Sequence, residues 1–235
     1  MLPIRAIAAM TIGAMMMFQS WGFMMPHQNP ADTLLLVNKY NKAPAVPPTL
    51  VLPDVPPTKE SVAGNIYMRP DAAAALEELF AGAREEGVIF YATSGFRSYS
   101  TQKAIFDRKS DQRGEKAANA SVANPGYSEH QTGLAMDVEG HSSLGIGLVD
   151  DFGETPEGKW LAQHCHEYGF IIRYPKGKTS ITGYIYEPWH IRFVGKEAAN
   201  EIFEMDITFE EYIVMKRMDR ILWLEGGVES SENDA

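Results

Sequence analysis

Short apolar segments, separated by glycines and prolines, follow one another in an order that limits how this chain can fold. Continuous or alternating apolar residues predict strands at residues 88–93, 132–138, 170–174 and 190–194. Helical spacing predicts helices at residues 72–86, 98 or 100 to about 109, 160–168 and 208–223. Because there is no strict strand-helix-strand repeat, the order predicts an α+β fold: a small, mainly antiparallel sheet with packed helices.

Local sequence features also predict where the regular elements begin and end. Asp71 is expected to cap the first of these helices and Gly87 to end it, since an acidic residue favours a helix start and glycine a helix end. Residues 110–125 are small and polar, which predicts a loop.

The two ends of the chain differ from its centre. After Arg5 comes a methionine-rich apolar run, and crossing a bilayer takes about 20 apolar residues, so we interpret residues 1–25 as a signal peptide or a membrane anchor. Frequent prolines in residues 26–58 predict an extended, irregular arm. Residues 59–223 are expected to form one globular domain, and the acidic residues 224–235 a disordered tail.

Charge and cysteine content narrow the classes of function. The chain has 21 basic and 31 acidic residues and a net charge of -10. This balance argues against nucleic acid as its main ligand, because phosphate binding needs a basic face. Cys165 is the single cysteine, which excludes an intramolecular disulfide framework and a zinc site built from several thiolates. Any metal must therefore be bound by histidines and carboxylates.

Two short segments hold most of the residue types that bind metals. Residues 128–137 contain His130 and Asp137, and residues 187–190 contain His190. A catalytic zinc site takes three protein ligands and leaves a fourth position open for water. These three side chains would supply that set.

The predicted strand at 132–138 affects whether His130 and Asp137 can reach the same metal ion. Alternation places Leu134, Met136 and Val138 on one face and Asp137 on the other. His130 would have to lie on a bend, for which Gly133 offers the backbone freedom. Taken singly, Asp137 is better interpreted as a solvated residue on an exposed strand face, and His130 as a surface loop residue.

Glu187 adds the second element that a metallohydrolase needs, a carboxylate that accepts a proton from water. It precedes His190 by three residues, so ideal strand geometry would send the two side chains to opposite faces. Pro188 suggests that the strand begins only after a bend, which would let both reach one cavity. The His-Glu-x-x-His pattern of helix-borne zinc peptidases is absent from the sequence.

Arg97 lies at a corner between a predicted strand and a predicted helix. Its planar guanidinium suits bidentate binding of a carboxylate, although an ordinary salt bridge explains it equally well. Gln102, about one turn into the helix, could add a hydrogen bond beside it. His164, Cys165 and His166 resemble a metal cluster, but residues two apart on a helix do not face one another, so we interpret them as core packing with a surface histidine.

Three motifs in order identify a resemblance. They are Ser-Gly-Phe-Arg-Ser at 94–98 with Gln102, Ser-x-His-x-x-Gly-x-Ala-x-Asp at 128–137, and Glu-Pro-Trp-His at 187–190. Together they resemble the VanY-type D-alanyl-D-alanine carboxypeptidases, zinc peptidases related to VanX-type dipeptidases and to hedgehog-type domains. The similarity covers roughly residues 34–194.

The resemblance implies a role for each matching residue. It implies that zinc is bound by His130, Asp137 and His190, and that Glu187 is the catalytic base. Arg97 is similar to the residue that contacts the substrate near the scissile bond and helps to stabilise the oxyanion. The remaining expected substrate contacts are Gln102, Ser128, Tyr174 and Trp189.

The function that follows is zinc-dependent removal of C-terminal D-alanine from peptidoglycan stem peptides, by direct attack of a metal-activated water. With the N-terminal segment, we expect an extracytoplasmic enzyme, secreted or anchored to the bacterial membrane. The alternatives are a D-Ala-D-Ala dipeptidase, a peptidoglycan endopeptidase of the same fold, or a non-catalytic zinc-stabilised binding module. A binding module has no need of Glu187, which favours catalysis.

Overall fold

The computed structural model describes residues 32–59 and 65–229, without the side chains of residues 222–229. The predicted signal peptide or anchor at 1–25 and the last tail residues, 230–235, lie outside this part of the chain. Among the residues that are described, no helix has both the length and the apolar character needed to cross a membrane.

Four antiparallel strands form one sheet in the order β1-β2-β4-β3. The strands are β1 (Phe90–Ser94), β2 (Ala135–Gly140), β3 (Phe170–Tyr174) and β4 (Glu187–Phe193). The small antiparallel sheet with packed helices confirms the predicted α+β fold. Three predicted starts are wrong: β1 begins at Phe90 rather than at residue 88, β2 at Ala135 rather than at residue 132, and β4 at Glu187 rather than at residue 190.

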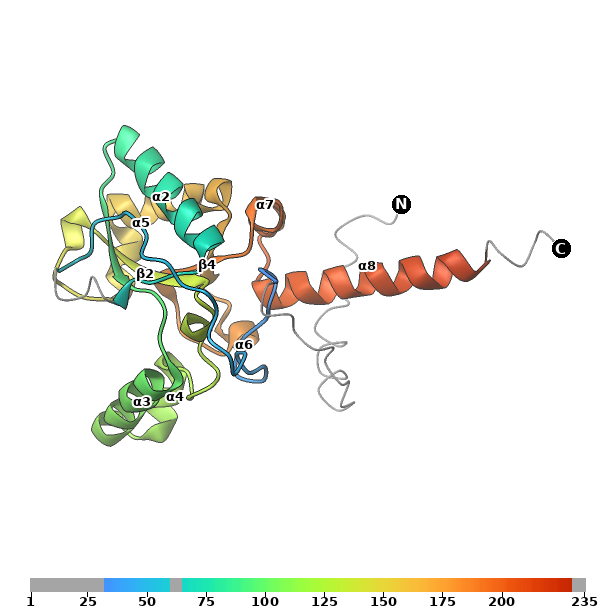
Figure 1. Ribbon diagram of the computed structural model, residues 1–235, viewed down its shortest axis with the longest axis horizontal. Helices are drawn as coiled ribbons and strands as arrows, with labels where there is room; N and C mark the ends of the chain where they lie inside the picture. Colours follow the sequence, from blue (N-terminus) through green and yellow to red (C-terminus); the bar gives the residue numbers. More distant parts are fainter. Residues whose placement is uncertain (1–31, 60–64, 230–235) are drawn as a thin grey trace.

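The helices lie around this sheet (Figure 1). The α-helices are α2 (Pro70–Glu85), α3 (Tyr99–Arg113), α4 (Glu115–Ser121), α5 (Pro156–His164), α6 (Thr179–Thr182), α7 (Lys196–Met205) and α8 (Phe209–Glu229). Short 3₁₀ helices are η2 (Glu129–Thr132), η3 (His141–Ser143), η4 (Asp150–Glu154) and η5 (Cys165–Tyr168).

Several helix boundaries correct the sequence-based expectation. Arg69, not Asp71, is the N-cap of α2, because Pro70 occupies the first turn, where its missing N–H costs nothing. The loop expected at 110–125 is largely helical, since α3 continues to Arg113 and α4 follows it. At the C-terminal end, α8 extends beyond residue 223 to Glu229, so residues 224–229, expected to belong to a disordered tail, are helical.

One face of the sheet carries the main hydrophobic core, which α2 and α5 cover. Leu134, Met136 and Val138 point into it, as their alternation predicted, and all three are fully buried. Leu76 and Leu79 of α2 pack on the same cluster and are also fully buried. Since a fully buried leucine contributes roughly 1.5–3 kcal/mol relative to an exposed one, burial of these side chains stabilises the domain.

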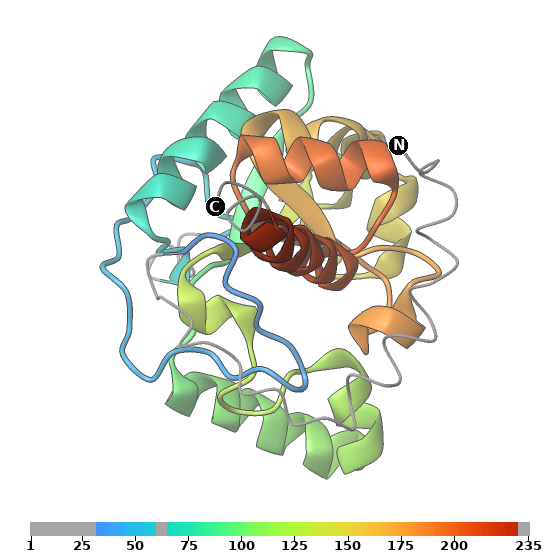
Figure 2. The same cartoon turned by 90° about the vertical axis from the view of Figure 1, so that its right-hand side faces the viewer.

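A second hydrophobic cluster joins α7, the first turns of α8 and the N-terminal arm. Phe209, Tyr212 and Ile213 of α8 pack there with Ile202 of α7 and with Leu36 of the arm. Beyond these turns α8 runs away from the rest of the domain, as Figure 1 shows from the side and Figure 2 along the helix. Packing of its first turns is therefore what holds α8 in place.

The described part of the arm, residues 32–58, contains no helix and touches the domain at separate points. Val51 forms an isolated bridge with Met68, and Pro57 forms one with Ala92 of β1. Asn38 closes a turn by accepting hydrogen bonds from the backbone N–H groups of Tyr40 and Asn41. The arm is therefore irregular but fixed, in agreement with its proline-rich composition.

Candidate active site

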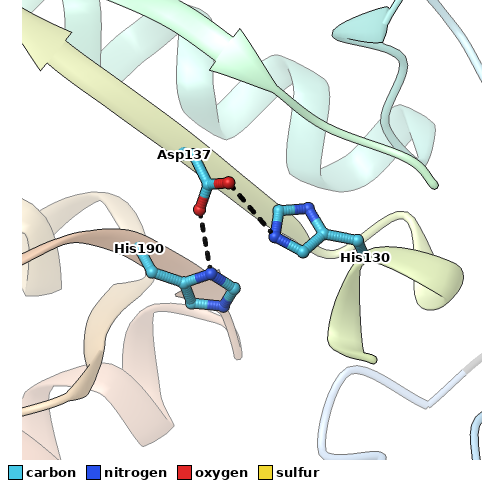
Figure 3. Close-up of side chains that lie close together, drawn as sticks. All are labelled: His130, Asp137 and His190. Atoms are coloured by element: carbon cyan, nitrogen blue, oxygen red, sulfur yellow. Dashed lines mark hydrogen bonds and ion pairs between the residues drawn. The ribbon is translucent and has the colours of Figure 1, made fainter. Parts of the chain in front are cut away.

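His130, Asp137 and His190 meet on the sheet face opposite the main core (Figure 3). Asp137 on β2 is the register partner of His190 on β4, so the two side chains leave the sheet together. His190 Nδ1 lies 2.9 Å from Asp137 Oδ1, and His130 Nε2 lies 3.4 Å from Asp137 Oδ2. One ligand-type atom from each residue lies within 4.8 Å of the others, and all three side chains are buried.

The local chain path brings His130 to this point. His130 belongs to η2, and this helix is capped at its C-terminal end by Gly133. Gly133 has the left-handed conformation, with φ 69° and ψ 12°. A Cβ atom at Gly133 would lie 2.9 Å from Leu50 Cδ2 and 3.1 Å from the backbone nitrogen of Arg69. Glycine is therefore required both by the backbone angle and by the available space. The prediction that His130 lies on a bend at Gly133 is confirmed.

Hydrogen bonds orient both imidazole rings. His130 Nδ1 lies 2.7 Å from the carbonyl oxygen of Gly95, so it is protonated and donates, which leaves the Nε2 lone pair facing Asp137. Burial lowers the pKa of His130, and the charge of Arg97 acts in the same direction. Burial alone would also lower the pKa of His190, but hydrogen bonds to Asp137 and Glu129 raise it to about 9.

Asp137 stays ionised in this buried position. Burial alone would raise its pKa, but His130 and His190 hold the pKa well below its usual range. The site therefore combines two ring nitrogens with one carboxylate. This donor set, in a compact arrangement, suits zinc.

Glu187 lies beside these residues at the start of β4. The register between β3 and β4 shifts there: Ile172 pairs with Ile191, but Tyr174 pairs with Glu187. This irregularity breaks the strict alternation that would have separated Glu187 from His190. Burial raises the pKa of Glu187 to about 7, with smaller effects from the charges of His190 and Asp137. A carboxylate with this pKa can both accept and release a proton near neutral pH.

Arg97 reaches the site from the corner between β1 and α3. Its Nη2 donates to Ser94 Oγ at 3.2 Å and to Asp137 Oδ2 at 3.1 Å, and its Nη1 donates to Gln102 Oε1 at 3.1 Å. The salt bridge considered from the sequence therefore exists, and its partner is Asp137. Gln102 is fully buried and also donates to the carbonyl oxygen of Ala123, so it supports Arg97.

The other expected substrate contacts occupy different positions. Tyr174 is buried with its ring centroid 5.0 Å from that of His190, next to the cluster. Ser128 is buried directly before η2 and makes no capping hydrogen bond with its side chain. Trp189 packs against the main hydrophobic core, because it alternates with His190 along β4.

Sequence reasoning missed a buried ion network under the site. Glu129 Oε1 accepts from Arg173 Nε and from Arg192 Nη1, each at 2.8 Å, and Arg173 also donates to both oxygens of Glu210. Glu129 Oε2 lies 3.4 Å from His190 Nε2. One feature of the sequence could have indicated this network, because the charged residues Arg173 and Arg192 interrupt two strands that are otherwise mostly apolar. Within the described residues, this network connects the cluster of His130, Asp137 and His190 to β3 through Arg173 and to α8 through Glu210.

The cluster at residues 164–166 does not form a site. Cys165 is buried in the main core, and burial raises its pKa to about 12. His164 Nδ1 pairs with Glu167, and His166 stacks on Phe203 with ring centroids 3.7 Å apart. The interpretation of these residues as core packing with a surface histidine is confirmed.

Comparison with known proteins places the chain in a family. The family model VanY, D-alanyl-D-alanine carboxypeptidase, matches residues 65–196. The putative carboxypeptidase YodJ of Bacillus subtilis is 50% identical over 187 residues, which cover 79% of this chain and 68% of that protein.

Solved structures agree in fold and in sequence. The LD-carboxypeptidase LdcB superposes with a TM-score of 0.75 at 49% identity, covering 79% of this chain and 87% of LdcB. A mutant D,D-pentapeptidase VanY in complex with Zn(II) has a TM-score of 0.66 at 34% identity, covering 77% of this chain and 98% of that one. VanYB in complex with D-alanine-D-alanine has the same score and identity. The chain therefore belongs to the VanY family of D-alanyl-D-alanine carboxypeptidases, and it is an enzyme of this zinc metallopeptidase type.

Proposed function

We propose that the enzyme removes C-terminal D-alanine from peptidoglycan stem peptides in a zinc-dependent reaction. One observation carries this proposal: His130, Asp137 and His190 converge in a buried cluster, beside a carboxylate, Glu187, whose pKa is about 7. A relative of this fold has been solved with Zn(II) and another with D-alanine-D-alanine, which supports the metal and the substrate class.

The three side chains would bind zinc through His130 Nε2, Asp137 and His190 Nδ1, because these atoms face one another. When bound, zinc supplies a Lewis acid that polarises the scissile carbonyl and makes water more acidic. The hydrogen bond from His130 Nδ1 to Gly95 keeps the other ring nitrogen available as a ligand.

Glu187 performs the proton transfers in this proposal. As water attacks the carbonyl carbon, Glu187 accepts one of its protons, and it then delivers that proton to the nitrogen of the departing D-alanine as the C–N bond breaks. The same group must accept and then donate, so a pKa near 7 suits both steps. Its burial is the physical cause of this pKa.

Arg97 is proposed to bind the substrate next to the scissile bond and to stabilise the oxyanion. Ser94 and Asp137 accept from Nη2 of Arg97 and Gln102 accepts from its Nη1, which fixes the orientation of the guanidinium before substrate arrives. A preorganised donor of this kind stabilises charge that develops in the transition state. Further substrate contacts are assigned to Gln102, Ser128 and Tyr174, of which Tyr174, beside His190, has the strongest geometric support. Trp189, also expected from the sequence as a contact, packs on the main core at the other face of the sheet and is not assigned this role.

The bond that is cleaved has two candidates. A D,D-carboxypeptidase would shorten pentapeptide stems, and an L,D-carboxypeptidase would shorten tetrapeptide stems. The LD-carboxypeptidase LdcB is 49% identical to this chain, whereas the D,D-pentapeptidase VanY is 34% identical. This difference favours the tetrapeptide as a substrate to be tested beside the pentapeptide.

Stem peptides are found outside the cytoplasm, so we place the enzyme there, either secreted or anchored. Residues 1–25 would direct its export, the arm at 26–58 would follow, residues 59–223 would form the peptidase domain, and 224–235 the acidic tail.

The test is D-alanine release by zinc-loaded protein from a pentapeptide stem, a tetrapeptide stem and free D-alanyl-D-alanine, with Glu187→Ala as control. Release from either stem that disappears in a variant still retaining zinc supports the proposal, and the better stem identifies the bond. Preference for the free dipeptide would make the enzyme a dipeptidase. No release from any of the three would refute D-alanine removal and leave an endopeptidase or a binding module.

A further inference from the structure

Glu129 is the most completely enclosed carboxylate at the candidate site, with a side chain that is 0% exposed. Its Oε1 accepts hydrogen bonds from two guanidinium groups, those of Arg173 and Arg192, each at 2.8 Å. Its Oε2 faces the ring of His190, 3.4 Å from Nε2. Glu129 is neither one of the proposed metal ligands nor the proposed base.

The surroundings of Glu129 fix the direction of its second oxygen. Arg173 is held from its other side by Glu210, and Arg192 Nη2 donates to the backbone carbonyls of Thr33 and Leu35. With both arginines fixed, the carboxylate cannot rotate without losing a charged hydrogen bond. Its Oε2 therefore stays directed at His190.

A carboxylate between two guanidinium groups can only accept hydrogen bonds. His190 Nε2 must then carry a proton, and in the neutral ring the lone pair lies on Nδ1, the nitrogen that faces Asp137. A metal-binding histidine commonly has its second nitrogen held in this way, which fixes the tautomer and the ring orientation.

We propose that Glu129 is a positioning residue for the metal site, which holds His190 in the tautomer that directs Nδ1 to the metal. This inference rests on the proposed zinc site but not on the identity of the substrate. The separation of 3.4 Å is long for a hydrogen bond, so the contribution is control of the tautomer and of the ring orientation rather than binding strength of its own.

The competing explanation is that Glu129 only ties β3, β4 and the arm together. Glu210→Gln is the matched control, because Glu210 belongs to the same network but its carboxylate oxygens accept from Arg173 and Asn38 rather than facing His190. In Glu129→Gln the amide oxygen satisfies the arginines, so the amide N–H groups face His190 Nε2 and favour the opposite tautomer.

Zinc affinity, measured by competition with a chromophoric chelator, separates the two explanations. Loss of such a supporting contact costs about 10–100-fold in metal affinity, and we expect a loss in this range for Glu129→Gln but little change for Glu210→Gln. Equal losses in both variants, or none in Glu129→Gln, would overturn the proposal.

A second measurement avoids variants, since removing one charge from a buried network can prevent folding. Nitrogen-15 NMR of histidine-labelled, zinc-loaded wild-type protein should show His190 with a proton on Nε2 and none on Nδ1. The reverse pattern would refute the role of Glu129. Neither readout uses D-alanine release, so a zinc-loaded protein with the predicted tautomer and no activity would refute the proposed function alone.

Discussion

Replacing Gly133 with alanine tests the local geometry that delivers His130 to the site. The left-handed backbone at Gly133, with φ 69°, costs an L-residue roughly 1–2 kcal/mol. In addition, the new Cβ would lie 2.9 Å from Leu50 Cδ2 and 3.1 Å from the Arg69 nitrogen, and overpacking of this kind costs about 1–3 kcal/mol. We therefore expect a loss of about 2–5 kcal/mol in the free energy of unfolding.

Gly87→Ala is the matched control for this prediction. Gly87 also has a positive φ, 77°, but nothing lies within 4 Å of a Cβ built there, so only the backbone cost of about 1–2 kcal/mol applies. Urea unfolding of both variants, followed by circular dichroism, measures the difference. If Gly133→Ala lost no more stability than Gly87→Ala, the close packing around Gly133 would not contribute, and the reasoning would be refuted.

Three further predictions follow from burial and charge. Arg173→Met leaves Glu129 and Glu210 without a shared partner, so thermal and urea unfolding should show a loss of about 3–5 kcal/mol; an unchanged stability would contradict this. Cys165 has a pKa of about 12 because it is buried, so iodoacetamide at pH 8 should label it, by mass spectrometry, only after unfolding. Glu187 must be ionised to act as a base, so kcat/KM should fall as the pH falls through and below about 7; a flat acid limb would argue against its role.

Local sequence patterns predicted the orientation of side chains along β2 and the bend that precedes this strand. Alternation alone placed Met136 and Val138 on the core face of β2, and Leu134, directly before the strand, on the same side, because the period of a strand is fixed by its backbone. The same alternation required a bend before the strand, and η2 with Gly133 supplies it.

The segment at 110–125, expected to be a loop but covered by the end of α3 and by α4, shows where such patterns fail. Within α3 the buried residues are Gln102 and Phe106 alone, and within α4 Ala118 alone. With so little apolar surface there is no periodic stripe to detect, so a polar segment was mistaken for a loop.

The candidate site also has features that the sequence predicts and features that only the tertiary structure shows. The sequence by itself determined which side chains are available as ligands and as a base, and, through the order of three motifs, which family the chain belongs to. Only the tertiary structure decided that Glu129 lies between Arg173 and Arg192, which are 44 and 63 residues away along the chain, and that burial raises the pKa of Glu187 to about 7. Desolvation and charge pairing depend on what distant segments bring together, so no local pattern encodes them.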